Sequence, residues 1–228
     1  MNTSSKIIVV VAIVAALGLG TLFGSMIAMK NDKDIQANTS TSEVAADSSA
    51  AKLRVDLNNL LREHVTTNLV VNRNIIDGAS QAKIDGAKAA QTANAVAIAT
   101  AVGSIYGQGA QDAITPPFVE HLAQSNNYAV AVKSGDMAAQ EASLTALRAE
   151  LRKVADVFNS VIPSVSSDAL YSALSAHEDL LNQAGVEYQN GNFEKAYALE
   201  NEALVQISGG ADVLTTGIIT AKPDMFKQ

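Results

Sequence analysis

Cysteine is absent from the 228-residue sequence, and its absence excludes several kinds of site at once. Without a thiol, the chain has no disulfide framework, no thiolate metal site, no cysteine nucleophile and no lipidated-cysteine anchor. A chain without cysteine is compatible with an existence outside the cytoplasm. Any metal site in this protein must therefore be built from other ligands.

Positive charge is also scarce. The 16 Lys and Arg residues are outnumbered by 23 Asp and Glu residues, which gives a net charge of −7 and a pI near 4.9. Binding to nucleic acid requires clustered basic side chains, so nucleic acid is not an expected partner. The same deficit argues against electrostatic docking of the folded domain on anionic lipid.

Prolines and aromatic residues are few: the chain has four prolines, and aromatic residues make up 4%. Hydrophobic residues still account for 48%, and alanine supplies much of this fraction. Alanine favours helices and is poor strand material. We therefore expect an all-α fold with long helices.

Familiar catalytic motifs are missing as well. The sequence contains no glycine-rich phosphate loop, no nucleophile elbow, no HExxH motif and no EF-hand loop. An enzymatic activity would therefore have to depend on a metal site.

The N-terminal region carries the longest apolar run. Residues 1–6 form a short polar tail, predicted to be cytoplasmic, and residues 7–29 carry no charge. As a helix, 23 residues measure about 34 Å, which exceeds the bilayer core of about 30 Å. Signal peptides usually have a shorter apolar core, so we favour an uncleaved transmembrane signal anchor over a cleaved peptide.

Residues 30–50 are small and polar and have no periodicity, which is typical of a flexible linker. The short tail and the acidic domain of residues 51–228 favour export of that domain. We expect a single-pass protein of the cell membrane, with the membrane as a partner of its N-terminal helix. Cleavage would instead give a secreted protein.

Apolar residues in the C-terminal domain recur at three- and four-residue steps, which predicts helices. A loop is expected between Gly107 and Pro117, with Pro116 and Pro117 starting the following helix. The predicted helices span residues 52–77, 80–105, 117–134, 136–161, 167–190 and 193–220.

The three histidines of the chain mark a repeat. His64, His121 and His177 are 57 and 56 residues apart, and each is followed fourteen residues later by a glycine (Gly78, Gly135 and Gly191). Glycine commonly ends helices. The pattern predicts a bundle of about six helices in three consecutive antiparallel hairpins, preceded by the transmembrane helix.

The histidines also lie on the apolar stripes of three parallel helices, at equal distances of about 21 Å from the turns. We expect the three imidazoles to meet in the core. Such a cluster suits Zn²⁺ or copper, provided that the rings lie within about 5 Å of one another and their nitrogens converge. The alternative is a buried polar layer in a structural or protein-interaction module of the cell envelope.

Polar residues near the histidines are candidates for supporting roles. Asn68 and Ser125 follow His64 and His121 by four residues and share their faces, while Asn94 interrupts the apolar stripe of the second helix. The acids next to the histidines (Glu63, Glu120 and Glu178) are about 100° away around the helix, so we interpret them as solvent-facing.

Several short motifs carry a family resemblance over about residues 53–226. They are Leu61-Arg62-Glu63-His64, Ser104-Ile105-Tyr106-Gly107, His121 with Tyr128, Gly191-Asn192-Phe193-x-x-Ala196-Tyr197 and Lys222-Pro223-Asp224-Met225-Phe226.

Together these motifs resemble exported, all-helical bacterial proteins of uncharacterised function that are sometimes labelled copper amine oxidase-like. The chain has no resemblance to the catalytic domain of a copper amine oxidase. Many members of the group carry a His-Met pair in the last helix, where this chain has Gln206 and Ile207. This departure weakens any metal site that the resemblance implies.

Overall fold

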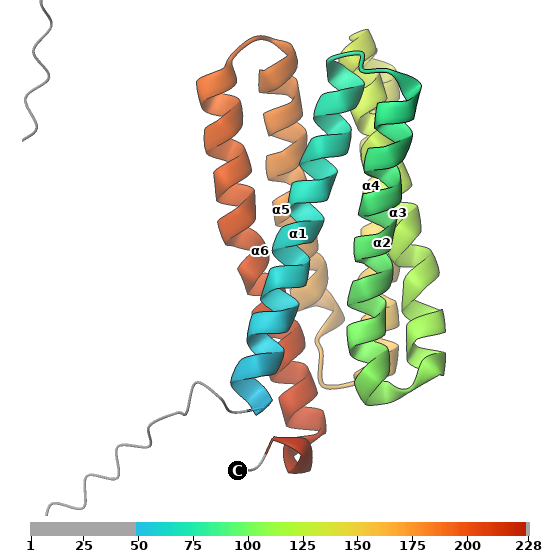
Figure 1. Cartoon of the computed structure of the whole chain (residues 1–228), viewed down its shortest axis with the longest axis vertical. Coiled ribbons are helices and arrows are strands. Elements are labelled where there is room, and N and C mark those ends of the chain that lie inside the picture. Colours follow the sequence, from blue (N-terminus) through green and yellow to red (C-terminus); the bar gives the residue numbers. More distant parts are fainter. Residues whose placement is uncertain (1–48, 227–228) are drawn as a thin grey trace, which may run out of the picture. The chain divides into compact units, whose positions relative to one another are not determined.

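The computed structural model describes residues 49–226 and contains six α-helices followed by a short 3₁₀-helix (Figure 1). The predicted tail, anchor and nearly all of the predicted linker lie outside these residues. The all-α prediction is confirmed for the described part. The helices are α1 (Ser49–Ile76), α2 (Gln81–Tyr106), α3 (Gln108–Ser134), α4 (Met137–Val161), α5 (Ser167–Gln189) and α6 (Phe193–Ala221), with the 3₁₀-helix η1 (Pro223–Met225).

A glycine turn joins the two helices of each hairpin, and all three turns have the same geometry. Gly78, Gly135 and Gly191 have φ values of 70°, 69° and 79°, in the left-handed region that glycine adopts without strain. In each turn, the N–H of the following residue donates to the carbonyl five residues earlier, at 2.9–3.1 Å. This is the Schellman arrangement, so the histidine-to-glycine repeat in the sequence is also a repeat in structure.

The start of the third helix differs from the prediction. Residues 107–116 do not form a loop: α3 begins at Gln108, and Pro116 and Pro117 lie inside it. Each proline removes one backbone N–H donor from the helix. Pro116 and the two residues that lose an N–H partner, Asp112 and Ala113, are exposed, so water can satisfy the freed carbonyls. The helix therefore continues through the prolines.

The helices alternate around a common axis. The first helices of the three hairpins, α1, α3 and α5, contact one another in the centre. Between them, α2 packs against α1 and α3, α4 against α3 and α5, and α6 against α5 and α1. The glycine turns lie at one end of the bundle (top of Figure 1), and the two ends of the described chain lie at the other. There, the Ser49 hydroxyl donates to the Met225 carbonyl at 3.2 Å.

Each histidine divides its helix into two halves of different polarity. The half before the histidine is apolar and buried, with Leu61 on α1, Phe118 on α3 and Leu174 on α5. The half toward the glycine turn buries polar side chains such as Asn68 and Ser125. Because α1, α3 and α5 are parallel, these halves align, and the buried polar side chains lie on the glycine-turn side of the histidines together with apolar ones such as Val71 and Leu181.

Among the described residues, one helix is long and apolar enough to span a membrane by length and composition. This helix is α6, with a mean hydropathy of 1.2 over its most apolar window. It packs along α1 and α5, and its buried residues, including Ile207, Leu214 and Ile218, belong to the core. Its composition is therefore accounted for by its place in the bundle.

Candidate metal centre

The three histidines meet at the centre of the bundle, each from a different hairpin. Their side chains are 0–1% exposed. The ring centroids of His64 and His121 are 5.2 Å apart, and those of His64 and His177 are 6.0 Å apart. The Nε2 atoms of His64 and His121 are separated by 3.2 Å. Without a metal, one of these rings can donate from Nε2 to the other, whereas binding of one ion by both rings requires both Nε2 atoms to be unprotonated.

A buried carboxylate completes the group. Glu178 is 1% exposed, and its Oε1 atom lies 3.3 Å from Nε2 of His177. Candidate ligand atoms of His64, His177 and Glu178 all lie within 4.8 Å of one another, whereas His121 joins this group through His64. The structure thus brings together the three predicted histidines and one acid.

The interpretation of Glu178 as solvent-facing was wrong, whereas Glu63 and Glu120 are exposed as predicted. Glu63 and Glu120 precede their histidines, but Glu178 follows His177. The residues that follow the other two histidines, Val65 and Leu122, are 0% and 2% exposed. The residue that follows the histidine is therefore buried in all three central helices. Comparison of the three repeats would have predicted that Glu178 is buried.

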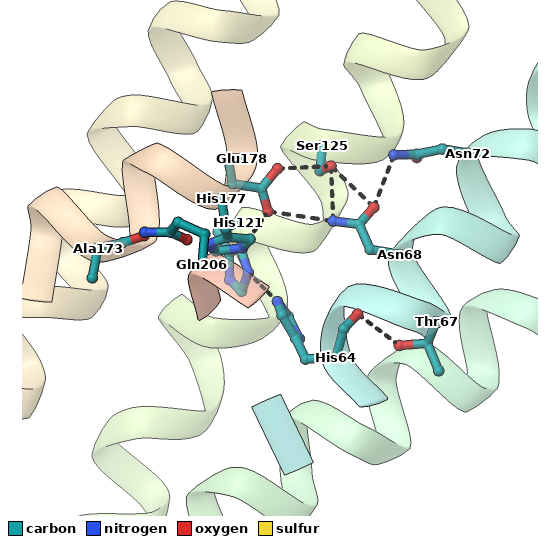
Figure 2. Close-up of polar contacts among 10 residues, drawn as sticks. All are labelled: His64, Thr67, Asn68, Asn72, His121, Ser125, Ala173, His177, Glu178 and Gln206. Atoms are coloured by element: carbon teal, nitrogen blue, oxygen red, sulfur yellow. Dashed lines mark hydrogen bonds and ion pairs between the residues drawn. The ribbon is translucent and has the colours of Figure 1, made fainter. Parts of the chain in front are cut away.

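Two of the predicted supporting residues hold this carboxylate (Figure 2). Asn68 donates from Nδ2 to Oε1 of Glu178, and Ser125 donates from Oγ to Oε2, both at 3.3 Å. Asn68 and Ser125 also bond to each other at 3.2 Å, and Asn72 donates to Oδ1 of Asn68 at 2.9 Å. The amide and hydroxyl groups orient Glu178 without supplying a positive charge.

Asn94 and Gln206 border the site from the outer helices. Asn94 donates from Nδ2 to the carbonyl of Leu60 at 3.0 Å and to Glu63 at 3.2 Å. It also lies close to His64 and acts to raise the pKa of that imidazole. Gln206 donates to the carbonyl of Ala173 at 3.1 Å, one turn before His177. The α6 position that distinguishes this chain from the resembling group therefore lies close to the histidines.

Burial keeps two of the imidazoles neutral. The pKa of His64 is well below its usual value because of burial and because His121 and His177 lie close by, while Glu178 and Asn94 oppose the decrease. The pKa of His121 is lowered to about 3, mainly by burial and then by His177, against the opposing effect of the Phe118 and Pro117 carbonyls. Neutral imidazoles have the lone pairs that metal binding requires.

Comparisons of the chain with protein-family models, curated proteins and solved structures found no match. The interpretation of the site therefore rests on its geometry and chemistry.

Proposed function

We propose that this protein is a metal-binding module of the cell envelope, anchored by its N-terminal helix, with His64, His121, His177 and Glu178 as the ligands of one divalent ion. The observation that carries the proposal is the convergence of three buried imidazoles on a buried carboxylate. The family resemblance, which points to exported helical proteins, agrees with the proposed location.

The spacing of the ligand atoms fits a small divalent ion. Tetrahedral ligands at about 2.0 Å from a metal are about 3.3 Å from one another. The Nε2–Nε2 distance of His64 and His121 is 3.2 Å, and the distance from His177 Nε2 to Glu178 Oε1 is 3.3 Å. Both distances match edges of such a tetrahedron. His121 lies outside the group whose ligand atoms are all within 4.8 Å of one another, so its ring would have to approach His177 and Glu178 when the ion binds.

Charge also favours a cation in this place. A buried carboxylate is costly unless a positive charge compensates it. In the part of the chain that the structure describes, the partners of Glu178 are Asn68, Ser125 and His177, with no Lys or Arg among its ion pairs. A divalent ion among the three imidazoles would compensate Glu178.

His177 favours this proposal over a purely structural polar layer. Its ring is fully buried, and Nε2 lies 3.3 Å from Oε1 of Glu178 without making a hydrogen bond. Native proteins satisfy most buried polar atoms, and an unsatisfied one costs about 1–3 kcal/mol. A metal ion bound at Nε2 would satisfy that nitrogen directly.

The ligand set indicates Zn²⁺ or Cu²⁺. Imidazole and carboxylate suit both ions, while Cu⁺ prefers thiolate and thioether sulfur. The chain has no cysteine, and the two methionines in the described range, Met137 and Met225, are 72% and 52% exposed, so neither is buried with the histidines.

Titration of the full-length chain in detergent with Zn²⁺ and Cu²⁺ tests the proposal. We expect one ion per chain and loss of binding when His64, His121 and His177 are all changed to Ala. Glu178→Gln keeps the shape of the side chain but removes its charge, and we expect the affinity for both ions to fall by about tenfold or more, in the range of effects seen at metal sites. Glu120→Gln makes the same change at an exposed acid next to His121 and is the matched control. Unchanged affinity in the triple variant would falsify the site.

A further inference from the structure

We propose that a groove between α3, α4 and α5, with Asn182 buried in its lining, is the route by which the metal ion enters and leaves the site. This inference rests on the proposed function, because the route needs a metal to carry.

The side of the site toward the chain ends is closed by apolar side chains. The ring of Phe118 contacts His121 and His64, with centroid distances of 4.8 and 5.2 Å, and Phe158 packs behind it at 6.2 Å. Both phenylalanines are 1% exposed. A hydrated cation cannot cross such a layer cheaply, because it would lose its water without gaining ligands.

The opposite side has a surface opening. A groove of about 380 Å³ is lined by residues of α3, α4 and α5, among them Tyr128, Arg148, Asp179, Asn182 and Glu187. Its charges are largely compensated, because Arg148 lies 3.4 Å from Asp179 and Glu187 pairs with Lys195. The groove is therefore wide enough for a hydrated ion and presents no strong positive charge to it.

Asn182 is the unusual member of this lining. Its side chain is 6% exposed, and neither Oδ1 nor Nδ2 has a hydrogen-bond partner. An apolar residue of the same size would avoid this cost. An amide oxygen in that position can instead bind the ion or one of its waters during passage, as amide oxygens do in cation sites.

One helical turn connects the groove to the ligands. Asn182 follows Glu178 by four residues on α5, a rise of about 6 Å, and Tyr128 follows Ser125 by three residues on α3. Ser125 in turn donates to Glu178. Polar groups therefore continue from the groove through Asn182 to the carboxylate that binds the ion.

A buried asparagine on another helix offers a control. Asn74 on α1 is 6% exposed, as Asn182 is, and has an unpaired Nδ2, but it does not line the groove. Asn74→Leu and Asn182→Leu thus make the same chemical change at equally buried positions, and only the second lies on the proposed route.

Stopped-flow kinetics on the full-length chain in detergent test the route, with Zn²⁺ as the probe and a coloured chelator as the acceptor. We expect Asn182→Leu to slow both capture and release of Zn²⁺ by tenfold or more, while the equilibrium Kd stays the same. Asn182→Ser should restore most of the rate, and Asn74→Leu should leave it unchanged. Val186→Phe narrows the same groove at a half-exposed position and should slow both rates, which provides a second test if Asn182→Leu does not fold.

The outcomes separate the route from the site. If unaltered protein binds no Zn²⁺, the proposed function fails and the route fails with it. If Zn²⁺ binds but the groove variants exchange it at the unaltered rate, or if only Asn74→Leu slows exchange, the route alone is overturned. A changed Kd in Asn182→Leu would also overturn the route, since it would make Asn182 part of the binding site.

Discussion

His64 and His121 are neutral in the folded protein because burial lowers the pKa of both imidazoles. In an unfolded chain, histidine titrates near pH 6.5. Between about pH 6.5 and pH 3, the unfolded state therefore binds more protons than the folded state, and acid favours unfolding. The stability contributed by neutral His64 and His121 is fully present above pH 6.5 and decreases as the pH falls, by up to about 1.4 kcal/mol per pH unit for each ring.

We therefore expect metal-free protein to unfold at a lower urea concentration at pH 5 than at pH 7. His121→Gln removes one of the titrating rings and should make this pH dependence shallower. Urea denaturation followed by circular dichroism at several pH values measures both effects. An equal pH dependence in the variant would show that His121 is not the source.

Only some of the residues of the site could be predicted from the sequence. The histidines, Asn68 and Ser125 were found because they lie on apolar stripes, and such stripes face the core. Glu178 was missed because a charged residue beside a stripe is normally solvated. Comparison with Val65 and Leu122, its counterparts in the other repeats, would have placed it inside.

Glycine turns end the first helix of each hairpin, and their contribution to the stability of the fold can be measured. Gly135 has a φ of 69°, and no atom lies within 4 Å of the position that a Cβ would take there. A side chain at Gly135 therefore meets backbone strain but no steric clash. Gly209 lies in α6 with ordinary helical backbone and equally open space.

We expect Gly135→Ala to destabilise the protein by about 1–2 kcal/mol, since a left-handed conformation is costly for alanine. Gly209→Ala should stabilise it by about 1 kcal/mol, because alanine is the better helix former. Thermal or urea unfolding of the two variants provides the comparison. Destabilisation by both substitutions to the same extent would contradict the role assigned to the turn.

Most helices could be predicted because the three- and four-residue spacing of apolar residues stops where a glycine follows. The exception is the first part of α3, where Pro116 and Pro117 were interpreted as a helix start. Proline favours a helix start because it lacks an N–H and because its ring crowds the carbonyl four residues earlier. In α3 the freed carbonyls belong to Asp112 and Ala113, which are exposed, and sequence alone does not reveal which face of a helix is exposed.

At the scale of the whole molecule, the proposed ion would stabilise the fold. A ligand present at about 100 times its Kd that binds only the folded state adds about 2.7 kcal/mol. For a domain of this size, that corresponds to a rise of about 5–10 °C in the midpoint of thermal unfolding. We expect this shift on adding Zn²⁺, its reversal by EDTA, and its absence in the triple histidine variant. A shift of equal size in that variant would place the stabilising ion elsewhere.

Each hairpin supplies one imidazole to the centre, so an ion bound by all three would connect the three hairpins of a chain that has no cysteine. The histidines are 57 and 56 residues apart in the sequence, and the ion would hold these segments together in the folded state. A chelator would remove this connection, whereas removal of a disulfide needs a reductant.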